Sequence, residues 1–294
     1  MKNFCRISLI IIIILFTCYN ASVISTSCRQ GLTLWYNSVI PVLLPFMLLT
    51  GVILNSLDLT KAPPLCSYLL ALVIGLFCGF PTGTMVVSFL YKHGLMDHET
   101  AQTLLPICNN VSPMFLYGYI YSNYLCSDLT FVRLLLCLYT PQIIYTGAVC
   151  LFRQIRKKSY YIEAAATVSG CREASCSQST SIIEASVHNI TSVGVYMVIF
   201  SITAGLIQHY FPSDITDIST AFLEISSGVD RISSIVPNAK IKTTLIISLT
   251  GFGGLSALFQ SHEMIKNSGL SFIKYILTKC LFAVLCATVA LSIL

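Results

Sequence analysis

The sequence predicts an all-α fold, a polytopic membrane helix bundle. Hydrophobic residues make up 55% of the 294 positions and charged residues only 10%, whereas an ordinary soluble domain carries roughly 25% charged residues. The net charge of +5 comes from basic residues scattered singly between apolar runs, unlike the basic patch of a nucleic-acid-binding surface. This composition excludes a soluble globular enzyme, a disordered chain and a nucleic-acid binder.

The spacing of the charges supports this fold class, because uncharged runs divide the chain. A helix needs about 20 apolar residues to cross the hydrocarbon core, so roughly seven or eight membrane segments fit. The tail after Lys279 is also apolar, and the one hydrophilic stretch, residues 153–184, has the composition of a linker loop. We therefore expect a first membrane half over 1–152 and a second over 185–294. The uncharged runs cover residues 7–28, 30–57, 62–91, 100–127, 134–152, 185–213 and 243–262.

The first half opens with two expected crossings, 7–24 and 32–57, the first of which has the basic start of an uncleaved signal anchor. The following run, 62–91, is interrupted at its centre by Gly79-Phe80-Pro81-Thr82-Gly83. Gly and Pro free backbone polar groups, which a membrane tolerates only where the break is buried in protein or lines a wet cavity. This pattern predicts a re-entrant helical hairpin at about 65–92, with a proline-kinked ordinary span as the alternative.

A second interruption falls inside the segment 99–126, where the chain reads Asn109-Asn110-Val111-Ser112-Pro113. Two Asn side chains at membrane depth are costly unless they are paired, and Pro113 disfavours helix at the residue before it. The pattern predicts a discontinuous helix whose amides and freed carbonyls face something polar. Hydrogen bonds that only pack one helix against another are the alternative.

In the second half, apolar residues recur at helical spacing through 214–235, which predicts an amphipathic helix. The glycine-rich centre Gly251-Phe252-Gly253-Gly254 predicts a second re-entrant hairpin at about 243–266. Each hairpin combines a Gly-Phe break with a later K-x-(x)-G-L turn. Counting crossings makes the first hairpin enter from the inside and the second from the outside. Opposed hairpins of this kind, here a weak inverted repeat, indicate a transporter site at the midplane.

The candidate site lies where the glycine-rich tips meet the Asn break. Side-chain hydrogen bonds would come from Thr82, Asn109, Asn110, Ser112, Ser256 and Gln260. The backbone would be opened at Gly79, Pro81, Gly83, Pro113, Gly251, Gly253 and Gly254.

No metal site, cofactor or enzymatic activity is expected. Most of the thirteen cysteines lie in apolar runs, where a thiol behaves as a small hydrophobe. Cys171 and Cys176 share the linker, and a metal or disulfide pair there is the one exception the sequence allows. The chain contains no HExxH or GxSxG motif and no paired intramembrane Asp, so an intramembrane enzyme is not favoured.

The motifs together resemble the sporulation integral membrane protein family (YlbJ type), which is grouped with the Gate, or nucleoside-recognition, membrane domains. The resemblance covers roughly residues 30–294. It is carried by a G-F-P-x-G turn at 79–83, an arm ending in Gly94-Leu95, the N-N-x-x-P-x-F break at 109–115, a later G-G-L-S…Q element at 253–260 and an N-terminal L-W…P…P-F segment at 34–46.

The resemblance implies a multi-pass protein of a spore-forming bacterium, in the mother-cell or forespore membrane, that is needed for a proper spore cortex and has no established substrate. We expect a transporter- or channel-like protein that moves a small solute. Its expected partners are membrane lipid and that solute, with a second copy of the chain or other sporulation proteins as candidates. The alternative is a membrane scaffold for cortex assembly that moves nothing.

Overall fold

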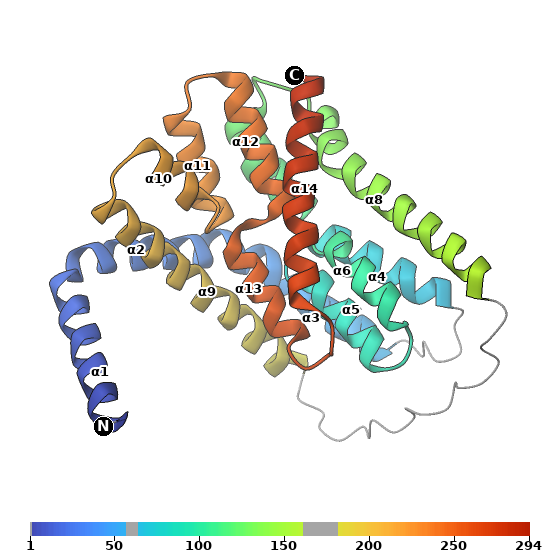
Figure 1. Ribbon diagram of the computed structural model, residues 1–294, viewed down its shortest axis with the longest axis horizontal. Coiled ribbons are helices and arrows are strands. Elements are labelled where there is room, and N and C mark those ends of the chain that lie inside the picture. Colours follow the sequence, from blue (N-terminus) through green and yellow to red (C-terminus); the bar gives the residue numbers. More distant parts are fainter. Residues whose placement is uncertain (1, 57–63, 161–181) are drawn as a thin grey trace.

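The computed structural model describes residues 2–56, 64–160 and 182–294, and helices are the only regular elements in these ranges. Helix α1 (Lys2–Tyr19) stands apart from the rest of the molecule (Figure 1). A bend of 80° at Asn20 separates it from α2 (Ala21–Leu34), which continues through the π-helical segment η1 (Trp35–Val39) into α3 (Ile40–Ser56). The predicted single crossing over 7–24 is therefore interrupted by a sharp bend.

The first Gly-Phe break separates two helices that pack against each other, α4 (Pro64–Cys78) and α5 (Thr82–Lys92). The tip of this hairpin is residues 79–81. Helix α6 (His98–Cys108) packs on both arms, and its first turn is capped by Asp97, whose carboxylate accepts from the Thr100 amide. Cys108 ends α6, and four non-helical residues follow before the chain becomes helical again.

The chain resumes as α7 (Pro113–Phe115) and the π-helical segment η3 (Leu116–Leu125), and then returns as the long helix α8 (Phe131–Tyr160). Part of the expected linker 153–184 is therefore helical, because α8 extends through residue 160. Helix α9 (Ile182–Tyr210) opens the second half. Residues 161–181 of the linker, with Cys171 and Cys176, lie outside the described residues.

The expected amphipathic helix 214–235 is two helices, α10 (Asp214–Ala221) and α11 (Ile225–Ile235). The break between them has a tertiary cause. The amides of Leu255 and Ser256 donate to the carbonyl oxygens of Phe222 and Leu223, at 2.9 and 2.8 Å. These carbonyls therefore bond the start of another helix, α13 (Gly254–Ile265), which a continuous α-helix over 214–235 would not allow.

Within the described residues, four helices are long and apolar enough to cross a membrane, or up to five when the bent pair at Asn20 is one span. This confirms the predicted fold class of a polytopic helical membrane bundle. These spans are Phe131–Phe152, Ser186–Tyr210, Ala239–Ile265 and Phe272–Ile293. The uncharged runs 134–152 and 243–262 fall within the first and third of them. Large hydrophobic side chains on the outer faces of α8 and the last helix, α14 (Phe272–Ile293), are exposed, as lipid-facing residues would be.

The second expected hairpin, 243–266, is wrong. Helix α12 (Ala239–Phe252) and α13 lie end to end and form one interrupted span, Ala239–Ile265. Figure 1 shows α13 continuing in the direction of α12, beside α14. Gly253 and Gly254 both adopt positive φ, 93° and 81°, so two residues break the helix and the chain then resumes its course.

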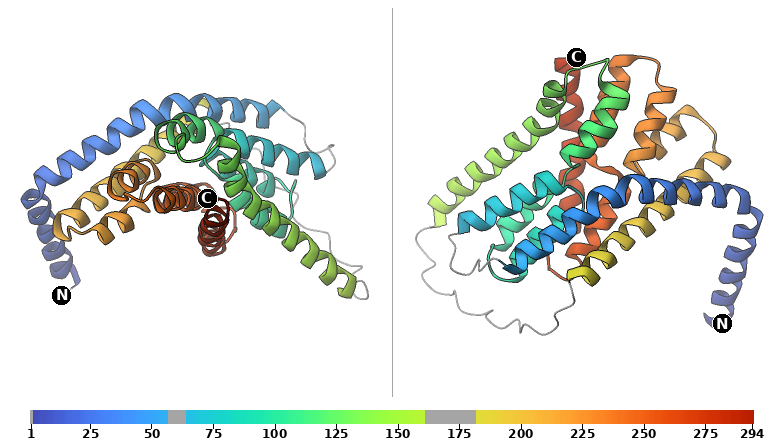
Figure 2. Two further views of the ribbon diagram at one scale, coloured as in Figure 1. Left: turned by 90° about the horizontal axis from the view of Figure 1, so that it is seen from above. Right: turned by 180° about the vertical axis from the view of Figure 1, so that it is seen from behind.

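The two segments that begin with a Gly-Phe break and end with a K-x-(x)-G-L turn, residues 79–95 and 251–270, which we call the Gly-Phe units, also run parallel and not in opposite directions. The Ser88 hydroxyl of α5 donates to the Met264 carbonyl of α13 at 2.9 Å. At the next helices, Gln102 of α6 exchanges two hydrogen bonds with the backbone of Ser271, at the start of α14. The K-x-(x)-G-L turns therefore close at the same end of the bundle, as the right-hand view of Figure 2 allows the reader to follow. The expected opposite orientation of the two hairpins was wrong, because the count of membrane crossings treated the Gly253 break as a reversal of the chain.

Candidate functional site

Three interruptions of the helices meet near the middle of the span Ala239–Ile265. They are the hairpin tip 79–81, the break 109–112 between α6 and α7, and the break at Gly253. The Phe80 amide donates to the Asn110 carbonyl at 2.9 Å, so two of the breaks satisfy each other's freed backbone groups. This is the arrangement in which irregular backbone is tolerated at membrane depth.

Glycine allows these segments to approach so closely. A Cβ atom at Gly253 would overlap the Phe80 ring, and a Cβ atom at Gly83 would overlap the Cys108 carbonyl oxygen. Gly253 also has a φ of 93°, a value that favours glycine. The Phe80 ring therefore lies in a notch on the second broken span, which we call the Gly253 notch.

Asn110 joins the first break to two further helices. Its side-chain amide donates to the Ile107 carbonyl at 2.6 Å and to Gln142 Oε1 of α8 at 2.8 Å. Its Oδ1 accepts from Gln142 Nε2 at 3.2 Å and from Lys279 Nζ of α14 at 2.9 Å. Every polar atom of this buried side chain is therefore paired within the protein.

Asn109 joins the same break to α13 and α14. Its Nδ2 donates to Ser261 Oγ at 2.5 Å and to the Tyr275 hydroxyl at 2.6 Å, and its side chain is fully buried. Its Oδ1 is left without a hydrogen-bond partner, and the same is true of the buried hydroxyls of Thr82 and Thr84 at the start of α5. Unpaired polar atoms cluster here beside the broken helices, where each costs about 1–3 kcal/mol.

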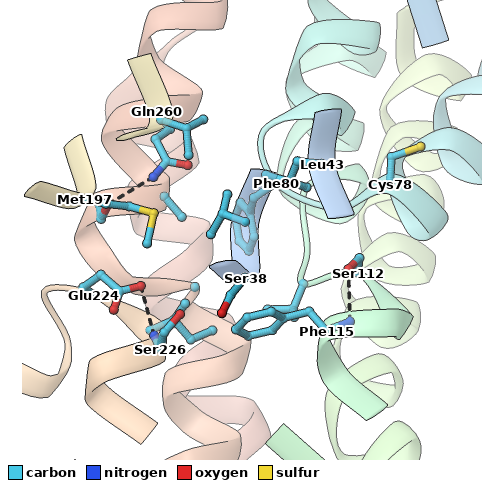
Figure 3. Close-up of a pocket in the computed structure, with 17 residues that line it drawn as sticks. Ser38, Leu43, Cys78, Phe80, Ser112, Phe115, Met197, Glu224, Ser226 and Gln260 are labelled. Atoms are coloured by element: carbon cyan, nitrogen blue, oxygen red, sulfur yellow. Dashed lines mark hydrogen bonds between the residues drawn. The ribbon is translucent and has the colours of Figure 1, made fainter. Parts of the chain in front are cut away.

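A cavity lies next to the meeting point, and Figure 3 shows side chains from both halves of the chain around it. About 90 Å³ is open to the centres of water-sized molecules, which exceeds the roughly 10–15 Å³ needed for one water. Each of the three breaks contributes one residue to the cavity wall, namely Phe80 from the hairpin tip, Ser112 from the break 109–112, and Gly253. The other lining residues are Ser38, Val39, Leu43, Cys78, Val111, Phe115, Val193, Met197, Glu224, Ile225, Ser226, Ser256, Ala257 and Gln260.

Glu224 supplies the one carboxylate in this lining and is 3% exposed. It lies at the α10–α11 interruption and caps α11, with Oε1 accepting from the Ser226 amide at 3.0 Å and Oε2 from the Ser227 amide at 2.7 Å. A helix N-terminus stabilises an anionic cap. The fourth interruption of the fold therefore also faces the cavity.

The predicted hydrogen-bonding residues separate into two groups. Ser112, Ser256 and Gln260 line the cavity, and Gln260 Nε2 donates to Ser256 Oγ at 3.0 Å. Thr82, Asn109 and Asn110 are buried at the breaks but are not part of that lining. Ser112 also caps α7 by accepting from the Phe115 amide at 3.3 Å (Figure 3).

The predicted backbone-opening residues all lie at or beside the breaks. Gly79 and Pro81 belong to the hairpin tip, and Pro113 is the first residue of α7. Gly251 comes near the end of α12, where a Cβ atom would press on Cys286 of α14. Gly83, Gly253 and Gly254 make the close approaches and turns described above.

Sequence reasoning missed Lys279. Its side chain is fully buried and its Nζ donates a hydrogen bond to Asn110 Oδ1. From the sequence, Lys279 was considered only as the residue that precedes an apolar tail. The available signal was a second lysine inside the apolar run 272–294, two turns beyond the start of the run and after Lys274, because an intramembrane ionisable group suggests function by default. Phe80 and Glu224 were also missed as cavity residues, since a ring and a capping carboxylate carry no distinctive spacing.

The described residues contain no group of three or more His, Cys, Asp or Glu side chains placed to hold a metal ion. The cavity lining offers hydrogen-bonding groups, apolar contacts and one capped carboxylate. An arrangement of this kind can hold and orient a small molecule.

Comparison with known proteins finds a weak relative, the sporulation integral membrane protein YlbJ of Bacillus subtilis (strain 168). The two are 26% identical over 136 residues, a match that covers 40% of this chain and 33% of the relative. The chain thus matches about a third of the length of that relative. No family model matches the chain, and no solved structure matches it. With the apolar helices, this likeness identifies the chain as a multi-pass membrane protein that is similar over part of its length to a sporulation protein.

Proposed function

We propose that this membrane protein acts in sporulation as a transporter- or channel-like protein for a small polar solute, and that spore cortex formation requires it. The sporulation part rests on the name of the weak relative and on the motif resemblance. The transport part rests on the geometry of the breaks. The proposed location is the mother-cell or forespore membrane.

One observation carries the transport proposal. Both interrupted spans and the hairpin tip present their breaks at one cavity, through Phe80, Ser112 and Gly253. Secondary transporters place substrate sites near the midplane where discontinuous helices meet, because the breaks there free backbone groups for the solute. The breaks 109–112 and 253 each fall between two helical stretches, and the second lies inside the candidate span Ala239–Ile265.

The chemistry of the lining narrows the solute class. Ser38, Ser112, Ser256 and Gln260 offer neutral hydrogen-bonding groups, and Glu224 offers the lining's only charge. Phe80 and Phe115 add aromatic surface. A neutral or cationic solute with hydrogen-bond donors suits this lining better than an anion does, since the cavity wall contains no Lys or Arg.

Transport is tested with purified protein in lipid vesicles, by measuring uptake and efflux of a panel of neutral, cationic and anionic metabolites by mass spectrometry. The variant Ala257→Phe fills the cavity, because Ala257 is part of its wall. Leu277→Phe is the matched control, since Leu277 is 63% exposed on α14. We expect movement of at least one solute that Ala257→Phe abolishes and Leu277→Phe leaves unchanged.

The scaffold alternative makes the opposite predictions for cells. In a strain that depends on this protein, Asn109→Ala and Gly254→Leu should abolish normal sporulation while the protein still inserts, if transport is its role. A scaffold would tolerate both changes and would be sensitive on its exposed loops. Normal spores from both variants, together with no movement of any solute in vesicles, would exclude the transport proposal.

A further inference from the structure

Lys279 is a buried lysine at the centre of the broken spans, and transport of a solute does not by itself explain its place. The side chain is fully buried, and Nζ donates to Asn110 Oδ1 at 2.9 Å. Nζ also lies 5.0 Å from the centroid of the Phe80 ring and 5.9 Å from that of Phe282. No carboxylate of the described residues forms an ion pair with it.

The elements packed on α14 surround Lys279 almost entirely with neutral groups. Asn110 faces it from the first break, the amide of Gln142 lies one hydrogen bond further on α8, and the hairpin tip presents the Phe80 ring. Titratable side chains near it are the thiols of Cys108, at the end of α6, and Cys286, on α14, and the buried phenol of Tyr275, one turn earlier on α14. Helix α12 faces this region with Thr250 and Gly251, neither of which titrates, and α13 reaches Asn109 through Ser261.

The space around Lys279 is too small for a solute. The adjoining void beside Asn110 and Gln142 has only about 10 Å³ open to the centres of water-sized molecules, which is room for about one water. Lys279 is not part of the wall of the larger cavity, and Phe80, which does line that cavity, lies over the ammonium group. Neither of these two spaces includes Lys279 in its wall, so the ligand that we consider for Nζ is a proton and not a solute.

We propose that Lys279 is a proton-binding coupling site, and that gain or loss of one proton at Nζ sets how firmly the hairpin tip is held in the Gly253 notch. The coupling role rests on the proposed transport function, whereas the proton site itself does not. Lysine suits this role because, unlike arginine, it can give up its proton when it is buried.

The step is a single proton transfer. The protonated amine passes one proton to a water molecule, the N–H electron pair stays on Nζ as a lone pair, and the side chain becomes neutral. The cation–π attraction to Phe80 is then lost and the bond to Asn110 loses its charge assistance. Because Phe80 occupies the Gly253 notch, a weaker hold on its ring loosens the contact between the hairpin tip and the α12–α13 span. Uptake of a proton from water reverses the step.

The proton site is tested without a solute by nuclear magnetic resonance of isotopically labelled lysine side chains in detergent micelles. The Lys279 resonance is the one that disappears in Lys279→Arg, and the matched control Lys266→Arg removes the resonance of an exposed lysine. We expect the Lys279 resonance to show one sigmoidal chemical-shift change between pH 5 and pH 9. A resonance that stays constant over this range would overturn the proposal.

The link to the hairpin tip is tested by fluorescence. Trp35 is the only tryptophan of the chain, so Trp35→Phe with Phe80→Trp places a single reporter at the tip. We expect its emission to change with the midpoint of the lysine titration, and to become independent of pH when Lys279→Gln or Lys279→Arg is added. Emission that follows pH equally in those variants would assign the change to another group and overturn the switch.

The two proposals fail separately. Movement of a solute through vesicles that contain a non-titrating Lys279 would overturn the coupling site and leave the proposed function intact. A titrating Lys279 in a protein that moves no solute would leave the proton site intact and remove the transport function. Where both hold, a pH gradient should drive solute accumulation in wild-type vesicles and not in Lys279→Gln vesicles.

Discussion

The two broken spans reach the same place in opposite ways. The break after α6 spans four residues, and its side chains Asn109 and Asn110 hold α8, α13 and α14 by hydrogen bonds. The break after α12 consists of two glycines with positive φ, Gly253 and Gly254, and an aromatic ring from the hairpin tip fills the space beside Gly253. One break is fastened by polar bonds, whereas the other is a steric notch.

The difference shows two ways to tolerate irregular backbone in a membrane. Polar side chains at a break resist movement because breaking their bonds leaves buried groups unpaired. A ring in a notch is held by packing and, here, by a cation–π contact from Lys279, so it can leave at lower cost. We therefore expect the first break to act as the fixed point and the second, with Phe80, as the part that moves.

The largest expected effect tests the fixed break. Asn110→Ala removes the acceptor of Lys279 and both bonds to Gln142, and we expect it to lower the free energy of unfolding in detergent by about 2–3 kcal/mol. Asn123→Ala is the control, because exposed Asn123 bonds only carbonyls of its own helix. The loss should shrink in a Lys279→Met background, and equal losses in both backgrounds would mean that the lysine bond contributes nothing.

The second prediction tests the notch. Gly253→Ala places a methyl group against the Phe80 ring and strains a positive φ, so we expect a loss of about 1–3 kcal/mol in the unfolding free energy. Gly147→Ala on α8 is the control, because a Cβ there meets open space. Adding Phe80→Ala to Gly253→Ala should restore part of the stability. No restoration would show that the strain in φ, and not the ring, makes glycine necessary.

The third prediction concerns the parallel arrangement of the two Gly-Phe units. Gln102→Ala removes the two bonds to the Ser271 backbone that join the starts of α6 and α14, and we expect a loss of about 1–1.5 kcal/mol. Thr288→Ala is the control, since that hydroxyl bonds only its own helix. Measured unfolding free energies that are equal for the two variants would contradict the pairing of these helix starts.

The smallest effect is at the far ends of the two spans, where Asp128 meets Lys242 at 2.8 Å. Burial raises the pKa of Asp128, but hydrogen bonds from Lys242, Ser127 and Thr243 outweigh it and leave the pKa below its ordinary value. A lowered pKa in the folded state stabilises the protein above the ordinary Asp value of about 4, and this contribution is lost as the pH falls further.

Asp128→Asn should therefore cost about 0.5–1 kcal/mol at neutral pH. The melting temperatures of wild type and variant in detergent should converge between pH 5 and pH 3. A difference that is unchanged at pH 3 would show that the charge of Asp128 is not the source of the effect.

The positions of the breaks could be predicted from the sequence because their causes are local. Gly79, Pro81, Pro113 and Gly253 disfavour helix whatever surrounds them, and the structure interrupts its helices at or beside each of them. The break between α10 and α11 could not be predicted, since it depends on the amides of Leu255 and Ser256. The direction of the chain after Gly253 was misjudged for a related reason, because one or two glycines are compatible with either a reversal or a continuation.

The sequence by itself determined that this chain is a membrane helix bundle. An uncharged, apolar run of about 20 residues is long enough to cross the hydrocarbon core whatever its neighbours are. The sequence also determined three of the helix breaks, at 79–81, 109–112 and 253, but not the break between α10 and α11. Only the tertiary structure decided that Ser112, Ser256 and Gln260 share a cavity. It also decided that Asn109 and Asn110 pack the helices beside this cavity, and that Lys279 lies where the helix breaks meet. The physical reason is that burial and pairing are properties of segments far apart in the sequence, and no local pattern encodes which of them meet.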